Sequence, residues 1–233
     1  MTVDEYRKKV DNAKRIVFFG GAGMSTESGI PDFRSTDGLY NMKYDLPPET
    51  ILSAEYFLRH TDKFFEFYFD KMIYRDAKPN AAHMKLAEWE KGGKLTAVVT
   101  QNIDGLHQAA GSRTVYELHG SVHRNTCLNC GRKYTLDDML ARKNSIPRCE
   151  CGGVIKPDVV LYGEGLPEDA VDGALDAIAA ADMLIIGGTS LSVYPAAGFV
   201  RYFRGGVDNV VVINKSVIPG YGNQLNGRIG ELL

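Results

Sequence analysis

The chain has 233 residues, of which 44% are hydrophobic, and it carries a formal net charge of −2. This length can bury a core as one domain, or as one domain with a small insert. No basic excess is present to neutralise phosphates, which argues against direct nucleic-acid binding. No apolar run approaches the roughly 20 residues that span a bilayer, so we expect no membrane partner.

The N-terminal residues 1–15 are charged and contain no apolar stretch, which predicts that no secretory signal is present. We therefore expect a cytoplasmic protein whose four cysteines are kept in a reducing compartment. Disulfides are rare there, so close cysteine pairs are candidates for metal binding.

Short runs rich in β-branched and aromatic residues predict strands that alternate with helices. Helical patterns cover 79–91 and 167–180, and each opens on a proline suited to a first helical turn. Strands separated by helices indicate an α/β fold, a Rossmann-like parallel sheet with helices on both faces. Its ligand crevice is expected at the carboxyl ends of the strands. The predicted strands are residues 15–20, 95–100, 113–119, 181–188 and 207–214.

Two segments interrupt this alternation. Residues 35–75 are rich in aromatics and helix-like, and residues 123–155 contain all four cysteines. Both are interpreted as insertions that together build a small zinc-binding and helical domain against the sheet. The larger Rossmann-like domain then comprises residues 1–34, 76–122 and 156–233.

The cysteines have the spacing C-x2-C, an 18-residue gap and C-x-C. Two close pairs at this separation suit a tetrahedral all-cysteine zinc site, in which nearby glycines permit tight turns. Four free thiols or two disulfides are the alternatives, but C-x-C is too short for an easy disulfide. We predict structural Zn²⁺, since four thiolates leave no open coordination position. The predicted ligands are Cys127, Cys130, Cys149 and Cys151.

A glycine-rich turn, Gly21-Ala22-Gly23, follows the first predicted strand. A flexible backbone with little side-chain bulk beside a helix N-terminus is a usual place for a pyrophosphate. The dinucleotide fingerprint G-x-G-x-x-G is not met, because position 26 is Thr. The glycines alone are therefore a weak signal of nucleotide binding.

Longer motifs follow in order from Gly20 to Asn214: "GAGMSTESGIPDFR", "TQNIDGLHQAAG", "LHG", the cysteine module, "IKPDVVLYGE", "GGTSLSVYPAA" and "VVIN". In content and order they resemble the sirtuins, which are NAD-dependent protein lysine deacylases. The resemblance implies a Rossmann-like NAD domain plus a zinc module, with an acyl-lysine protein or peptide bound in the cleft between them. The implied reaction removes acetyl groups from lysine and gives nicotinamide, O-acetyl-ADP-ribose and free lysine.

The resemblance also assigns the long loop after the first strand. It places the phosphates on Ala22, Gly23 and Ser25, and it makes Thr26 to Arg34 a loop that closes over NAD. Phe33 would shield the reactive ribose carbon from water, and the Arg34 fork would hold phosphate or ribose oxygens. The residues of this loop predicted to bind NAD are Gly21, Ala22, Gly23, Ser25, Thr26, Ile30, Asp32, Phe33 and Arg34.

The implied catalytic residues follow the next two predicted strands. His119, in the L-H-G motif, is the expected general base that draws a proton from the ribose hydroxyls. By the same resemblance, Asn102 orders a water near the ribose, and Asp104 accepts a hydrogen bond from the nicotinamide amide. Asp104 also suits a helix cap. Gln101 and Ile103 complete this part of the NAD site. The remaining histidines are interpreted as structural or surface residues: His60, His83, His107 and His123.

The C-terminal motifs supply the adenosine side of the NAD site and the peptide site. Gly188, Thr189 and Ser190 would bind the adenine-side ribose and phosphate, and Asn214 the ribose hydroxyls. Lys215 and Arg228 would line the adenine through their backbone. An added peptide strand would lie between two chain segments, which gives affinity with little sequence preference. These peptide segments comprise Val160, Leu161, Tyr162, Gly163 and Glu164 on one side, and Ser192, Val193 and Tyr194 on the other.

The choice of acyl group depends on the helical insert. Family members that prefer acidic acyl groups have a Tyr-x-x-Arg pair there, and this chain has Tyr68 and Lys71. Lys71 cannot form a bidentate fork, and the neighbouring Asp70 opposes an anion. We therefore predict deacetylation, with deacylation of longer neutral groups as an alternative. Two other classes are weighed: a protein ADP-ribosyltransferase, and a non-enzymatic NAD-binding or zinc scaffold, which would be expected to lack His119 or Asn102.

Overall fold

The computed structural model describes residues 1–32 and 46–233. Its larger half is built around a six-stranded sheet with the order β3-β2-β1-β7-β8-β9, in which every neighbouring pair is parallel. The strands are β1 (Ile16–Gly20), β2 (Leu95–Thr100), β3 (Val115–Glu117), β7 (Met183–Gly187), β8 (Val210–Asn214) and β9 (Gln224–Asn226).

Both faces of this sheet are covered by apolar packing. Along β1, Phe18 packs with one hydrophobic cluster, whereas Val17 and Phe19 pack with another on the opposite face, and all three are fully buried. This is the alternation of a strand buried on both sides. The first cluster includes residues of α1 (Val3–Asn12), α5 (Ala81–Lys91) and α9 (Ile229–Leu232), and the second includes residues of α8 (Glu168–Ala180) and η4 (Ala196–Tyr202).

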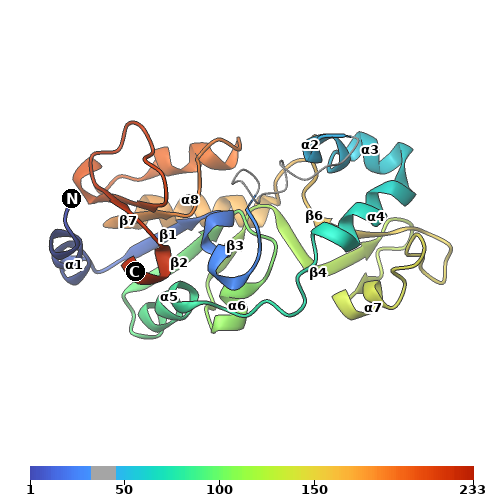
Figure 1. The fold of residues 1–233 in the computed structure, drawn as a ribbon, viewed down its shortest axis with the longest axis horizontal. Coiled ribbons are helices and arrows are strands. Elements are labelled where there is room, and N and C mark those ends of the chain that lie inside the picture. The colour runs from blue at the N-terminus through green and yellow to red at the C-terminus, as the bar shows by residue number, and fades with distance from the viewer. Residues whose placement is uncertain (33–45) are drawn as a thin grey trace.

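The smaller half carries an antiparallel sheet with the order β5-β4-β6. Its helices pack Phe64, Phe65 and Tyr68 into one cluster with residues of β4 and β6. In the ribbon this half lies at the right, and both chain termini lie at the far end of the larger half (Figure 1). Its elements are α2 (Pro48–Ile51), α3 (Ala54–Arg59), α4 (Thr61–Lys71), β4 (Gly120–Cys127), β5 (Lys133–Tyr134), α7 (Leu136–Leu140) and β6 (Ile155–Val159).

The predicted fold class is confirmed, and the element bounds differ in detail. The strand predicted over 113–119 is shorter, because Gly120 turns with a φ of 74° and starts β4. The helix predicted from residue 79 begins at Ala81, because the Asn80 side chain caps its first turn. The other predicted helix begins at Glu168, one residue after Pro167. The sequence patterns did not predict α1 or β9.

The division into two domains with the bounds given above stays a prediction. Two segments at these bounds belong to the small sheet and not to the parallel one, because β6 pairs with β4: residues 120–122 and residues 156–159. Residues 35–45 of the helical insert lie outside the described residues, and 46–75 contain α2, α3 and α4. Within residues 1–32 and 46–233, no helix has the length and apolar character required to cross a bilayer.

Candidate active site

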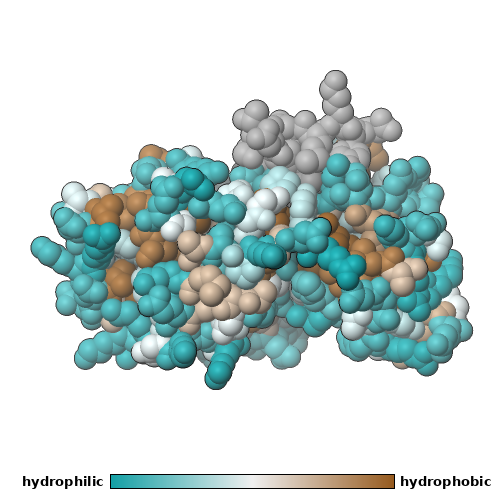
Figure 2. Space-filling view, turned by 60° about the horizontal axis from the view of Figure 1, so that its bottom comes forward, coloured by the Kyte–Doolittle hydropathy of each residue, from teal (hydrophilic) through white to brown (hydrophobic). Residues whose placement is uncertain are grey.

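A cavity of about 880 Å³ lies where the two halves meet. Its walls come from the carboxyl ends of β1 and β2, from the segment after β6 and from the end of α4. The space-filling view shows hydrophobic residues among the polar ones in this middle region (Figure 2). The predicted site residues that line this central cavity are Ala22, Ser25, Ile30, Gln101, Asn102, Ile103, Asp104, His119, Val160, Leu161, Tyr162, Gly163, Glu164, Val193 and Tyr194.

The turn after β1 packs directly against the turn after β7. Gly23 N donates to Gly188 O over 2.7 Å. A Cβ added at Gly23 would lie 2.8 Å from the Gly188 backbone, and Gly188 itself has a φ of 61°. Glycine is therefore required on both sides of this contact, because a side chain on either turn would separate them.

Ser25 joins two of the predicted catalytic and nicotinamide residues. Its Oγ donates to Asp104 Oδ2 over 2.6 Å and accepts from Asn102 Nδ2 over 3.1 Å. The other carboxylate oxygen, Asp104 Oδ1, accepts from Leu106 N over 2.9 Å at the start of α6 (Leu106–Ala110). Asp104 Oδ1 therefore holds the first amide of this helix while the residue also lines the cavity, and its role at nicotinamide stays a prediction.

His119 also lines the cavity, and a backbone contact fixes its tautomer. Its Nδ1 lies 3.0 Å from Gln101 O. Because a carbonyl oxygen only accepts, Nδ1 carries the proton and Nε2 keeps a lone pair. Burial lowers the pKa of His119 below its ordinary value, and the Gln101 carbonyl partly opposes that change. The ring is therefore neutral at pH 7 and able to accept a proton at Nε2.

The four cysteines come together as their spacing predicts. The Sγ atoms lie within 4.8 Å of one another, with Cys127 and Cys151 3.5 Å apart and Cys130 and Cys149 3.6 Å apart. These distances exceed the ~2.05 Å of a disulfide and approach the edge of about 3.8 Å for a tetrahedron with Zn–S bonds near 2.3 Å. The four thiols therefore fit one structural zinc ion.

Comparison with known proteins decides the family. The model of the Sir2 family matches residues 21–195. This chain belongs to the Sir2 family. An NAD-dependent protein deacetylase of Clostridium acetobutylicum is 54% identical over 238 residues, which cover 99% of this chain and 96% of that protein.

Solved Sir2 structures share the fold along nearly the whole chain. A Sir2 structure with a p53 peptide and NAD⁺ has a TM-score of 0.86 at 37% identity, covering 99% of this chain and 95% of that one. A Sir2 complex with a deacetylated p53 peptide and 3′-O-acetyl-ADP-ribose has a TM-score of 0.90 at 36% identity, with the same coverage.

Further predicted NAD residues of this Sir2 chain form a cluster beside the cavity. Thr189 Oγ1 donates to Gln101 Oε1 over 2.9 Å, and Asn214 Nδ2 donates to Thr189 O over 3.2 Å. Gln101 Nε2 is buried and has no hydrogen-bond partner within the described residues. A buried donor of this kind costs free energy unless a ligand pairs with it. Together with the close glycine turns, it fits an oxygen-rich ligand such as NAD.

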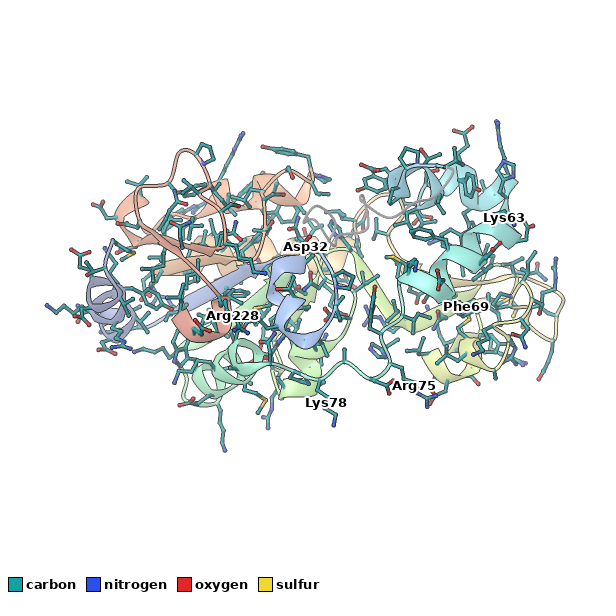
Figure 3. The ribbon with its side chains drawn as sticks, viewed as in Figure 1. Asp32, Lys63, Phe69, Arg75, Lys78 and Arg228 are labelled. Carbon is teal, nitrogen blue, oxygen red and sulfur yellow. The ribbon has the colours of Figure 1, made fainter. Side chains whose placement is uncertain are left out.

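The other predicted NAD residues either do not line the central cavity or lie outside the described residues. Phe33 and Arg34 lie outside the described residues. Asp32 lies near the middle of the molecule, between the two halves (Figure 3). Arg228, whose backbone we expect at the adenine, has its side chain 3.3 Å from Glu27 and 3.3 Å from Glu231. The remaining predicted residues are not among those that line the central cavity: Gly21, Gly23, Thr26, Gly188, Thr189, Ser190, Asn214 and Lys215.

Of the two insert residues that we expect to bear on acyl choice, Tyr68 and Lys71, only one lines the cavity. Lys71 lines the cavity and its Nζ lies 3.0 Å from Asp70 Oδ2. Tyr68 is 1% exposed within the aromatic cluster and is not among the residues that line the cavity. Its hydroxyl has no hydrogen-bond partner among the residues that the structure describes.

His123, which we interpreted from the sequence as a structural or surface residue, contacts the backbone of Asp104. His123 Nε2 lies 3.0 Å from Asp104 O, and a Cβ added at Gly105 would lie 2.7 Å from the His123 ring. His123 therefore packs over Gly105 and holds the backbone beside Asp104. Nothing in the local sequence pattern indicates this contact, because β4 and the segment after β2 meet only in the folded chain.

Proposed function

We propose that this Sir2 chain is an NAD-dependent protein lysine deacetylase, whose products are nicotinamide, O-acetyl-ADP-ribose and free lysine. The observation that carries the proposal is His119. Its Nδ1 proton is held by Gln101 O, its Nε2 is left as a base, and it shares one cavity with the turn after β1 and with both predicted peptide segments.

The roles of the residues follow from their chemistry. His119 Nε2 accepts a proton from the ribose hydroxyls, which lets the 2′-oxygen attack the acyl carbon after the acyl oxygen has displaced nicotinamide from the ribose. Asn102 orders a water near the ribose, and Asp104 accepts a hydrogen bond from the nicotinamide amide. A base with a pKa at or below neutrality suits this step, because it is deprotonated before the substrate arrives.

The peptide is proposed to bind between two segments at the mouth of the cavity. Val160 to Glu164 and Val193 to Tyr194 line the same cavity. Tyr162 and Tyr194 are 42% and 63% exposed, so an added strand could cover them. Backbone pairing in this position gives affinity with little sequence preference, which suits an enzyme that acts on lysines in different proteins.

The proposal is tested with one acetyl-lysine peptide, NAD and purified protein, followed by mass analysis. Free lysine peptide, nicotinamide and O-acetyl-ADP-ribose should form in equal amounts. A protein ADP-ribosyltransferase would instead increase the mass of the acceptor and yield no O-acetyl-ADP-ribose. A scaffold would consume no NAD, so either of these outcomes would contradict the proposal.

A further inference from the structure

The turn after β1 sets the position of Ser25. This turn, which we call the 22–28 turn, comprises η1 (Ala22–Met24), Ser25 and η2 (Thr26–Ser28). Ser25 is 1% exposed and bridges Asp104 and Asn102 through its hydroxyl. A displacement of the turn by even 1 Å would break this bridge, because hydrogen bonds weaken steeply with distance and angle.

Asn80 holds one side of the 22–28 turn. Its Oδ1 accepts from Ala82 N and His83 N and so caps α5. Its Nδ2 donates to Met24 O over 2.8 Å and to Ser28 Oγ over 3.0 Å. A helix cap requires only the side-chain oxygen. The amide nitrogen therefore serves a second purpose, which is to tie the turn to the helix.

Glu27 holds the other side. Its side chain is 14% exposed, Oε1 accepts from Gly230 N over 3.0 Å, and Oε2 lies 3.3 Å from the Arg228 guanidinium. A Cβ added at Gly230 would lie 2.9 Å from Glu27 Oε2, so the carboxylate fits closely against that backbone. Arg228 is labelled beside the turn, although it lies 201 positions from Glu27 in the chain (Figure 3).

We propose that Asn80 and Glu27 are positioning residues for NAD. They fasten the 22–28 turn from α5 and from the C-terminal segment, and so hold Ser25 against Asp104 and Asn102. Neither is among the residues that line the central cavity, so both act through Ser25 and not on the substrate. The inference rests on the proposed function, since NAD affinity is the property that the two residues would control.

Two variants of Asn80 separate positioning from capping. Asn80→Asp keeps an oxygen for the α5 cap but has no donor for Met24 O, whereas Asn80→Ala loses both. We expect Asn80→Asp to raise the Kd and KM for NAD about three- to tenfold, the loss of about one hydrogen bond. Its kcat should stay within about twofold of the wild type, because the lost contact stabilises bound NAD equally in the ground state and in the transition state. If Asn80 only caps the helix, Asn80→Asp should match the wild type and only Asn80→Ala should be impaired.

Variants of Glu27 test the second contact in the same way. Glu27→Ala should raise the Kd and KM for NAD about three- to tenfold. Glu27→Gln keeps an oxygen for Gly230 N and should recover part of that loss. The matched control is Glu231→Ala, which removes the exposed partner of Arg228 without touching the turn and should leave NAD binding unchanged.

Hydrogen exchange without NAD supplies a readout that does not depend on activity. In Asn80→Asp and Glu27→Ala, amides of the 22–28 turn should exchange faster, while those of β1 and β2 keep wild-type protection. Unchanged exchange together with unchanged NAD affinity overturns the inference. A wild-type protein that binds no NAD overturns the proposed function instead, and exchange still shows whether the two residues hold the turn.

Discussion

At the scale of single residues, the site depends on hydrogen bonds that fix protonation and orientation. Gln101 O selects the tautomer of His119, and Ser25 orients both Asp104 and Asn102. These contacts join residues from the segments that follow different strands, so that each side chain is held before a substrate binds. Such preorganisation is the condition for efficient proton transfer and for precise placement of reacting groups.

The change His119→Ala should abolish turnover while NAD binding stays within about tenfold, because a general base contributes about 10²–10⁴ to the rate and little to ground-state affinity. Single-turnover deacetylation and NAD titration measure the two effects separately. His60→Ala, at an exposed histidine, is the control and should keep wild-type activity. If the His119 variant retains more than about a tenth of wild-type activity, another group is the base.

Acyl selectivity is tested at Lys71. We expect kcat/KM to be far higher for an acetyl than for a succinyl peptide, since burying an unpaired carboxylate costs several kcal/mol. Lys71→Arg should raise the succinyl rate, because a planar fork can bind a carboxylate with two hydrogen bonds. The same change at Lys63, whose side chain is 61% exposed on the outer part of the smaller half, is the control (Figure 3).

Equal or higher rates on the wild-type succinyl peptide would contradict this prediction and would indicate that another cation lines the cavity. The burial of Tyr68 strengthens the expectation for the wild type. A carboxylate near Lys71 would meet an ammonium already paired with Asp70, and the Tyr68 hydroxyl is enclosed by the aromatic cluster. For the same reason, Lys71→Arg should reverse the acyl preference only in part.

At the scale of elements, the cysteine module organises the small sheet. β4 ends at Cys127, and the turn after it returns to the sheet as β5. Cys127 and Cys149 are buried beside the aromatic cluster, whereas Cys130 and Cys151 are exposed. Metal binding at these thiolates therefore joins two loops to a core that the two-residue β5 could not stabilise alone.

The change Cys127→Ser should lower the zinc content and stability before it alters any chemical step. We expect the Tm to fall by about 5 °C or more, because about 1 kcal/mol shifts the Tm of a chain of this size by about 2–4 °C. A chelator should lower the Tm of the wild type and leave that of the variant nearly unchanged. Metal analysis that finds well under one zinc per wild-type chain would refute the structural zinc site.

At the scale of the whole molecule, stability should depend on pH through two buried histidines. His83 in α5 and His107 in α6 are 0% and 1% exposed, and their ring centroids lie 4.7 Å apart. Burial lowers the pKa of His83 to about 4, and the Asp104 carboxylate opposes this change to a smaller extent. Burial also lowers the pKa of His107 to about 3, and the charge of the neighbouring His83 adds to that effect. Both rings are neutral in the folded chain at pH 7.

In the unfolded chain the two histidines bind protons near pH 6.5, whereas in the folded chain they do so only near pH 4 and 3. The free energy of unfolding is therefore at its full value above pH 6.5 and decreases as the pH falls towards 4 and 3. At pH 5 the two groups together should cost about 4 kcal/mol of stability. Thermal unfolding from pH 7.5 to 5 measures this loss. His107→Leu should make the slope shallower, whereas the exposed His60→Gln should not, and equal slopes for all three proteins would contradict the prediction.

The local sequence was sufficient for five of the six strands of the parallel sheet and for the choice of metal ligands. Apolar strands such as 95–100 are buried wherever they lie in a sheet, and a C-x2-C pair is close in space because it is close in the chain. The motifs likewise placed Asn102, Asp104 and His119 at the ends of their strands, where parallel strands bring side chains to one edge. The strands and the closeness within each cysteine pair follow from short-range geometry, whereas the meeting of the two cysteine pairs depends on how the small sheet folds.

Only the tertiary structure decided which distant groups meet. Glu27 contacts Gly230 across 203 positions, and Asn80 reaches Met24 across 56. The tautomer of His119 depends on a carbonyl 18 positions away, and Tyr68 is enclosed by packing within the smaller half. No periodicity or spacing encodes such contacts, because they depend on how separate elements pack, and packing is set by the shape of the whole core.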